Sequence, residues 1–137
     1  MGFSSGTMRV AAAAMLLGAA PAAAQEIAPL IGHWRGDVIE TLAERTTRYR
    51  MFVSIDADRR GRPVASVSYS LECRGIWTGA ERRGRVWHLE ETITAGRANC
   101  APHVEVELAP AGDGLRVRLY PVGHPEQLAL ALLRRTP

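Results

Sequence analysis

The chain has 137 residues, of which 47% are hydrophobic and 23% charged, and its formal net charge is +3. This length suits a single domain. The basic residues are all arginine, and three groups of them fall at predicted turns or at the C-terminus: Arg59 and Arg60; Arg82, Arg83 and Arg85; and Arg134 and Arg135. We therefore expect solvated charge at these positions and exclude a basic face that binds nucleic acid.

The first 24 residues have the pattern of a secretory signal peptide. Arg9 supplies a positive start, residues 10–20 are rich in alanine and leucine, and residues 22–24 form a small-residue cleavage site. The apolar run is too short to span a bilayer, which needs about twenty residues. We expect cleavage after Ala24, leaving residues 25–137 as one domain in the periplasm or outside the cell. The alternative is an N-terminal helix of a cytosolic protein.

The remaining chain alternates between apolar and polar residues with period two and has no convincing helical period. The expected strands cover residues 30–38, 48–55, 65–71, 74–80, 85–94, 103–109, 115–119 and 127–133. We predict an all-β fold, an antiparallel meander of eight strands closed into a small up-and-down barrel. Such a barrel is filled by side chains or holds one small ligand. A curled open sheet or a sandwich is the alternative, and residues 126–135 could instead form a terminal helix.

Cys73 and Cys100 are the only cysteines in the chain. In an oxidising compartment they are expected to form a disulfide that ties the start of the fourth strand to the loop after the fifth. Their spacing is not the Cys-x-x-Cys of a redox pair. The histidines are scattered without zinc-site spacing, so we expect no metal and no cofactor.

The fifth predicted strand places a carboxylate on its apolar face. Trp87, Leu89, Glu91 and Ile93 alternate with polar neighbours, so Glu91 faces the interior if this set does. A buried charge needs a partner, and an arginine can meet a carboxylate through two hydrogen bonds. We predict that Arg74 or Arg97 pairs with Glu91.

Three roles for Glu91 follow from that position. The first is a salt bridge that closes one end of the barrel. The second is a polar spot in a ligand pocket, with Trp34, Trp77 and Trp87 as an aromatic wall or as core. The third is a catalytic carboxylate, although Glu90 and Glu91 point to opposite faces and cannot act together across one bond. No nucleophile elbow, phosphate-binding glycine loop or zinc-protease motif is present.

The spacing of several motifs resembles a group of small bacterial extracytoplasmic β-domains of no established activity. The matching motifs are Gly32-x-Trp34-x-Gly36, Tyr69-x-Leu71-x-Cys73-x-Gly75, Leu89-x-Glu91-x-Ile93-x-x-Gly96-x-x-x-Cys100 and Val104-x-Val106-x-Leu108. Members occur as secreted proteins and as outer modules of larger surface proteins, including receptor-like kinases. The resemblance implies the fold, the disulfide and the location. The Gly-x-Trp opening also resembles the first strand of lipocalin- and avidin-type barrels, which implies a similar topology.

These observations favour a non-catalytic, monomeric binding module of the bacterial envelope or secretome. Its partner is a small ligand, an envelope component or another protein. The alternative is an exported inhibitor of a hydrolase such as lysozyme, with residues 95–102 and 121–126 as candidate inhibitory loops. A small enzyme that uses Glu91 is a further alternative.

Overall fold

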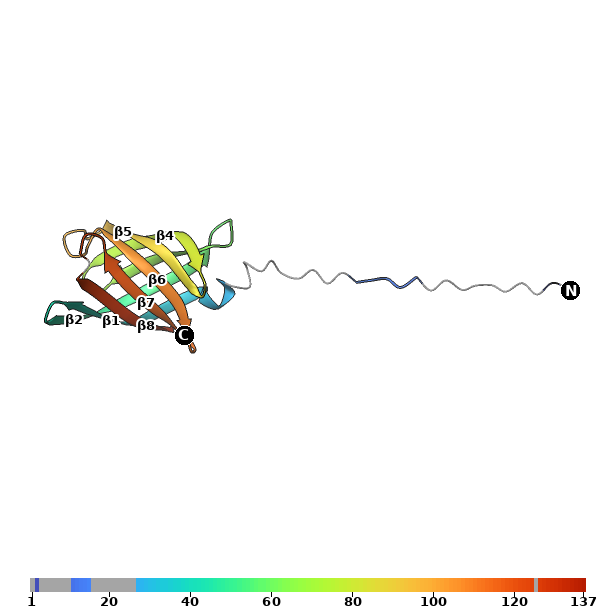
Figure 1. The fold of residues 1–137 in the computed structure, drawn as a ribbon, viewed down its shortest axis with the longest axis horizontal. Coiled ribbons are helices and arrows are strands. Elements are labelled where there is room, and N and C mark those ends of the chain that lie inside the picture. Colours follow the sequence, from blue (N-terminus) through green and yellow to red (C-terminus); the bar gives the residue numbers. More distant parts are fainter. Residues whose placement is uncertain (1, 3–10, 16–26, 125) are drawn as a thin grey trace.

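The computed structural model describes residue 2 and residues 11–15, 27–124 and 126–137. The predicted signal peptide and its cleavage site therefore fall largely outside the described part of the chain. In that part a short 3-10 helix, η1, leads into eight antiparallel strands (Figure 1). The elements are η1 (Ala28–Leu30), β1 (Gly32–Leu42), β2 (Arg45–Ala57), β3 (Pro63–Tyr69), β4 (Cys73–Arg83), β5 (Val86–Ala95), β6 (His103–Ala111), β7 (Gly114–Pro121) and β8 (Gln127–Arg135).

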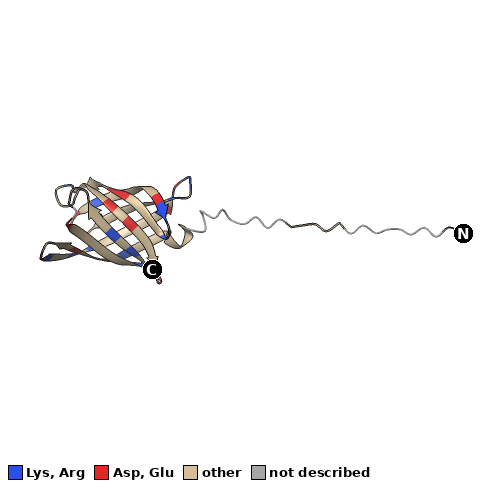
Figure 2. Cartoon of the chain, viewed as in Figure 1, with Lys and Arg blue, Asp and Glu red and all other residues tan. Residues whose placement is uncertain are grey.

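Each strand pairs with its neighbours in sequence, and β1 also pairs with β8 to close a barrel. The predicted meander and its closure are confirmed, and the C-terminal segment is a strand and not a helix. No helix among the described residues is long and apolar enough to cross a membrane. Acidic and basic residues are interspersed along the strands of the visible face (Figure 2).

The alternation seen in the sequence becomes the inside and the outside of the barrel, because successive side chains of a strand point to opposite faces. On β3 every second residue from Pro63 to Tyr69 is buried, and β7 repeats this pattern. The narrow interior is filled by these apolar side chains, as expected for eight strands. The core includes Trp34, Trp77 and Trp87.

One end of the barrel is covered by η1 and the C-terminal residues of β8. The Trp34 ring nitrogen donates to the carbonyl of Leu30 at 2.8 Å, and both residues are buried. The Arg135 guanidinium lies 4.3 Å from the centroid of the Trp34 ring and donates to the carbonyls of Ile31 and Pro29. A Cβ on Gly32 would stand 2.6 Å from that guanidinium. In the Gly-x-Trp motif, the glycine therefore leaves room for the guanidinium and the tryptophan provides the ring on which it stacks. The Arg135 side chain is exposed, as predicted, but its guanidinium also stacks on the Trp34 ring and donates to two backbone carbonyls.

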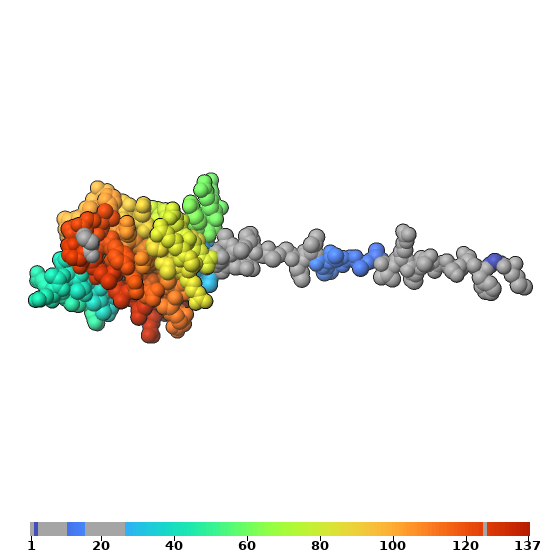
Figure 3. All heavy atoms as spheres, in the orientation of Figure 1, coloured from blue at the N-terminus to red at the C-terminus, as the bar shows by residue number. Residues whose placement is uncertain are grey.

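The first hairpin is longer than predicted. β1 and β2 continue together to Leu42 and Arg45, joined by a tight turn in which Ala43 has a φ of 54°. The side chains of residues 41–48 are exposed on both faces. This part of the hairpin therefore lacks the alternation of apolar and polar residues from which strands are predicted. It projects at the end of the barrel opposite η1 (Figures 1 and 3).

The predicted disulfide between Cys73 and Cys100 is present and joins the start of β4 to the β5–β6 loop. Gly96, in the same loop, has a φ of 75° and lies against β4, where a Cβ would stand 2.2 Å from the carbonyl oxygen of Glu72. The bond and the glycine together hold this loop against the rim of the barrel.

Replacing Arg135 by alanine should lower the free energy of unfolding by about 1–2 kcal/mol. The substitution removes the contact with the Trp34 ring and two hydrogen bonds from a charged donor. Lysine should recover only part of this loss, because an ammonium cannot lie flat on the ring and reach both carbonyls. Urea unfolding measures the effect, and Arg134→Ala is the matched control. Equal values for the two alanine variants would contradict the role of Arg135.

The double variant Cys73→Ala, Cys100→Ala should be less stable by about 3.5 kcal/mol. The cysteines are 27 residues apart, and the chain-entropy model gives this magnitude for the loop that they close. Urea unfolding without reductant compares the variant with the unmodified protein. Adding reductant should destabilise the unmodified protein and leave the variant unchanged, and a loss below about 1 kcal/mol would refute the prediction.

Candidate functional site

A cavity of about 230 Å³ lies at the end of the barrel opposite η1. This end carries the β1–β2, β3–β4, β5–β6 and β7–β8 connections (Figures 1 and 3). The cavity is lined by Glu40, Tyr49, Tyr69, Leu71, Glu91, Asn99, Cys100, Ala101, Val104, Leu119, Pro121, His124, Gln127 and Ala129. It exceeds the roughly 150 Å³ that can hold a benzene molecule and falls short of the roughly 300 Å³ at which drug-sized sites begin.

Glu91 is the one buried charged residue in the described core, with 3% of its surface exposed. Its inward position, predicted from the alternation on β5, is confirmed. The Tyr69 hydroxyl donates a hydrogen bond to Glu91 Oε1, and the Trp77 ring nitrogen donates to the same oxygen at 2.8 Å. Trp77 stands directly opposite Glu91 in the β4–β5 ladder, whereas Tyr69 reaches it from β3.

The second carboxylate oxygen of Glu91 is left for the cavity. Both donors bond to Oε1, and the described residues provide no further hydrogen bond to Glu91. Every fully buried side-chain oxygen in the described part of the chain has a hydrogen-bond partner. The unbonded Oε2 of Glu91 is therefore not fully buried. Because Glu91 lines the cavity, Oε2 is the atom that faces it.

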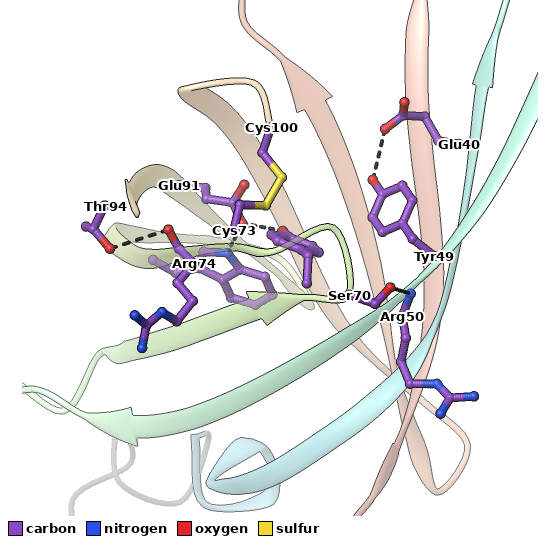
Figure 4. Close-up of a disulfide and its surroundings, with 11 residues drawn as sticks. Glu40, Tyr49, Arg50, Ser70, Cys73, Arg74, Glu91, Thr94 and Cys100 are labelled. Carbon is purple, nitrogen blue, oxygen red and sulfur yellow. Dashed lines mark hydrogen bonds between the residues drawn. A yellow bond between two sulfur atoms is a disulfide. The ribbon is translucent and has the colours of Figure 1, made fainter. Parts of the chain in front are cut away.

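A second tyrosine–glutamate pair lies beside the first. The Tyr49 hydroxyl on β2 donates to Glu40 Oε2 on β1 at 2.9 Å (Figure 4). The rings of Tyr49 and Tyr69 meet edge to face, with centroids 5.8 Å apart. Two phenols and two carboxylates from β1, β2, β3 and β5 are thus collected at one end of the barrel.

Burial changes the acid–base properties of these groups. It raises the pKa of Glu91, and the hydrogen bonds from Tyr69 and Trp77 offset only part of that rise. Burial, followed by the charge of the paired glutamate, raises the pKa of Tyr49 and of Tyr69 above the ordinary 10.0. Both phenols therefore stay protonated and act as hydrogen-bond donors.

The prediction that an arginine neutralises Glu91 is wrong. The Arg74 side chain is exposed and its guanidinium points away from Glu91 (Figure 4). Arg97 donates through Nε to the carbonyl of Ile93 and holds its own loop. The physical reason is that neutral donors already satisfy Oε1, so the carboxylate is stabilised without a buried counter-charge.

The three tryptophans do not form one wall. Trp77 contacts Glu91, but Trp34 lies at the end covered by η1, and Trp87 pairs with Arg82 near the β4–β5 turn. None of the three lines the cavity. They belong to the core, which is one of the two roles considered for them.

Four residues of the cavity lining were not predicted as site residues: Tyr49, Tyr69, Glu40 and His124. Tyr69 could have been found, because a phenol on a buried strand face needs a hydrogen-bond partner and Glu91 was the predicted buried acceptor. Glu40 stood outside the first predicted strand, and His124 lies in a turn. No group of three or more potential metal ligands occurs among the described residues.

Taken together, the described residues define a small antiparallel β-barrel protein of eight strands, with one disulfide and a polar cavity at one end. A similar solved structure is Rv2717c from M. tuberculosis, which is 18% identical, with 85% of this chain and 99% of that chain covered at a TM-score of 0.49. No family model matches the sequence, and no curated protein matches it. At this level of similarity the comparison carries no argument about function.

Replacing Glu91 by glutamine should change how stability depends on pH. The glutamine side chain would keep an acceptor for Tyr69 and Trp77 but would not titrate. The pKa of Glu91 in the folded protein is raised above its ordinary 4.5. Its stabilising contribution is therefore complete below about pH 4.5 and is lost as the pH rises through the folded-state pKa.

Urea unfolding from pH 4 to pH 8 tests this expectation. The stability of the unmodified protein minus that of Glu91→Gln should decrease as the pH rises. Glu90→Gln, which removes an exposed carboxylate from the neighbouring position, is the control for the loss of one negative charge. A difference that stays constant across this range would contradict a raised pKa.

Proposed function

We propose that this protein is an exported, non-catalytic binding module that takes up one small ligand in the cavity at the open end of its barrel. The observation that carries the proposal is the contrast between the two ends. At one end Trp34, Arg135 and η1 cover the core, whereas at the other an accessible volume remains beside two carboxylates. A concave site with a few convergent polar groups on an apolar lining is typical of ligand binding.

Export is supported by two features. The disulfide between Cys73 and Cys100 is of the kind that persists in oxidising compartments, and residues 1–24 have the composition of a signal peptide. The resemblance to extracytoplasmic β-domains points to the same location. The periplasm or the extracellular space is therefore part of this proposal.

Binding is favoured over catalysis because the tyrosines in the cavity are poor nucleophiles. Burial raises the pKa of both phenols, so neither is activated by its neighbouring carboxylate for covalent chemistry. A catalytic role of Glu91 stays a prediction.

Inhibition of a hydrolase also stays a prediction. The disulfide and Arg97 hold the β5–β6 loop in place while residues 97–99 remain exposed. That pre-organisation would suit an inhibitory loop. The same loop supplies Asn99 and Ala101 to the cavity lining, which favours ligand binding as its first role.

Blocking the cavity should abolish ligand uptake without unfolding the barrel. Leu71 is half-buried at the rim and lines the cavity, so Leu71→Trp would fill part of the volume. Ligand-observed NMR with a panel of cationic, neutral and anionic fragments measures uptake. Fragments should bind the unmodified protein and Leu128→Trp, a control on the outer face of β8, but not Leu71→Trp. Uptake by none of the proteins, or equal uptake by all three, would refute the proposal.

A further inference from the structure

The described residues that line the cavity include two glutamates and no arginine, and the ring of His124 lies 3.6 Å from the carboxylate of Glu126. The ionisable groups among these lining residues are Glu40, Glu91, Tyr49, Tyr69 and His124. The tyrosines are neutral donors already bonded to the glutamates. An anionic ligand would lie beside two carboxylates without an arginine to balance it, so its binding is electrostatically unfavourable.

Each glutamate keeps an oxygen for a ligand. Tyr49 bonds to Oε2 of Glu40, and both donors to Glu91 bond to Oε1. The two remaining oxygens need donors, because each is an acceptor at the edge of a partly buried site. An ammonium offers three N–H donors, and its hydrogen bonds to carboxylates are roughly twice as strong as neutral ones.

The rest of the lining suits an apolar body. It is formed by Leu71, Ala101, Val104, Leu119, Pro121 and Ala129. If about 150 Å³ holds the six carbons of benzene, then the volume of about 230 Å³ corresponds to roughly nine or ten heavy atoms.

We propose that the ligand is a small primary amine with an apolar body, whose ammonium group is bound by Glu91 and Glu40. The inference rests on the proposed function and assigns its ligand class. The two tyrosine rings add an attraction, since a cation near an aromatic ring is stabilised by the ring's electrons. The apolar body of the amine packs against the side chains of β6, β7 and β8.

Binding of such an amine should shift Glu91 toward its ionised form, so protons should be released at pH values where Glu91 is still partly protonated. In the free protein burial favours the protonated form of Glu91, and a neighbouring ammonium favours the ionised form. The groups that face this site from other elements are Glu40 from β1, Tyr49 from β2, Tyr69 from β3, Trp77 from β4 and His124 from the β7–β8 loop. Calorimetry in two buffers of different ionisation enthalpy, repeated from pH 4 to pH 7, reports the protons released in this range.

The experiment compares three probes of nearly equal shape: 2-phenylethylamine, 2-phenylethanol and phenylacetate. Isothermal titration calorimetry with the unmodified protein at pH 7 gives the affinities. The amine should bind at least tenfold more tightly than the alcohol, and phenylacetate should not bind.

Variants assign the preference to the carboxylates. Glu91→Gln should weaken amine binding at least tenfold and alcohol binding by less, because the alcohol carries no charge and the amide still accepts from Tyr69 and Trp77. Glu40→Gln should weaken amine binding as well. Glu90→Gln is the matched control, since Glu90 points to the outer face, and it should have no effect. A thermal unfolding curve for each variant confirms that the barrel is folded.

The outcomes separate this inference from the proposed function. If the alcohol or phenylacetate binds as tightly as the amine, or if Glu91→Gln does not weaken amine binding, the amine assignment is refuted and the cavity remains a binding site. If the three probes fail to bind but other fragments bind and Leu71→Trp blocks them, the amine assignment is also refuted and the cavity remains a binding site. If no fragment of any charge binds, both proposals are wrong.

Discussion

The antiparallel pairing of β1 with β8 is the constraint on which the rest of the structure depends. It extends from Trp34 opposite Arg135 to Leu42 opposite Gln127 and converts an open meander into a barrel without edges. Only after closure do alternate side chains acquire a common interior. The same pairing brings Arg135 over Trp34 at one end and Gln127 to the cavity at the other.

The two ends of this barrel differ because their side chains differ in size and polarity. At the end covered by η1, Trp34 and Leu30 are nearly inaccessible and the interior is apolar. At the opposite end Tyr49, Tyr69, Glu40 and Glu91 replace aliphatic residues. A carboxylate in this position is unfavourable unless its oxygens are hydrogen-bonded, and the neutral donors Tyr69 and Trp77 provide that stabilisation. The site therefore contains two glutamate side chains and no arginine.

Period-two alternation made most of the strands and the inward position of Glu91 predictable. Where alternation failed, so did prediction, as in residues 41–47, which are exposed on both faces. The partner of Glu91 was also missed. Arg74 follows Cys73 and Arg97 lies three residues before Cys100, so the disulfide was expected to hold both near Glu91, but Arg74 is exposed and Arg97 bonds to the backbone. Tyr69 lies on β3, and nothing in its local sequence shows that its hydroxyl crosses the interior to β5.

The sequence by itself determined most of the strands, the pairing of the only two cysteines, and which residues of each strand share a face. These features follow from the pattern of short sequence segments and from the number of cysteines. The tertiary structure alone decided which strand faces meet across the barrel, that Arg135 covers Trp34, and that two tyrosine–glutamate pairs gather beside a cavity. The reason is that strand order, register and closure set distances between residues far apart in the chain, and those distances determine which donor reaches which carboxylate.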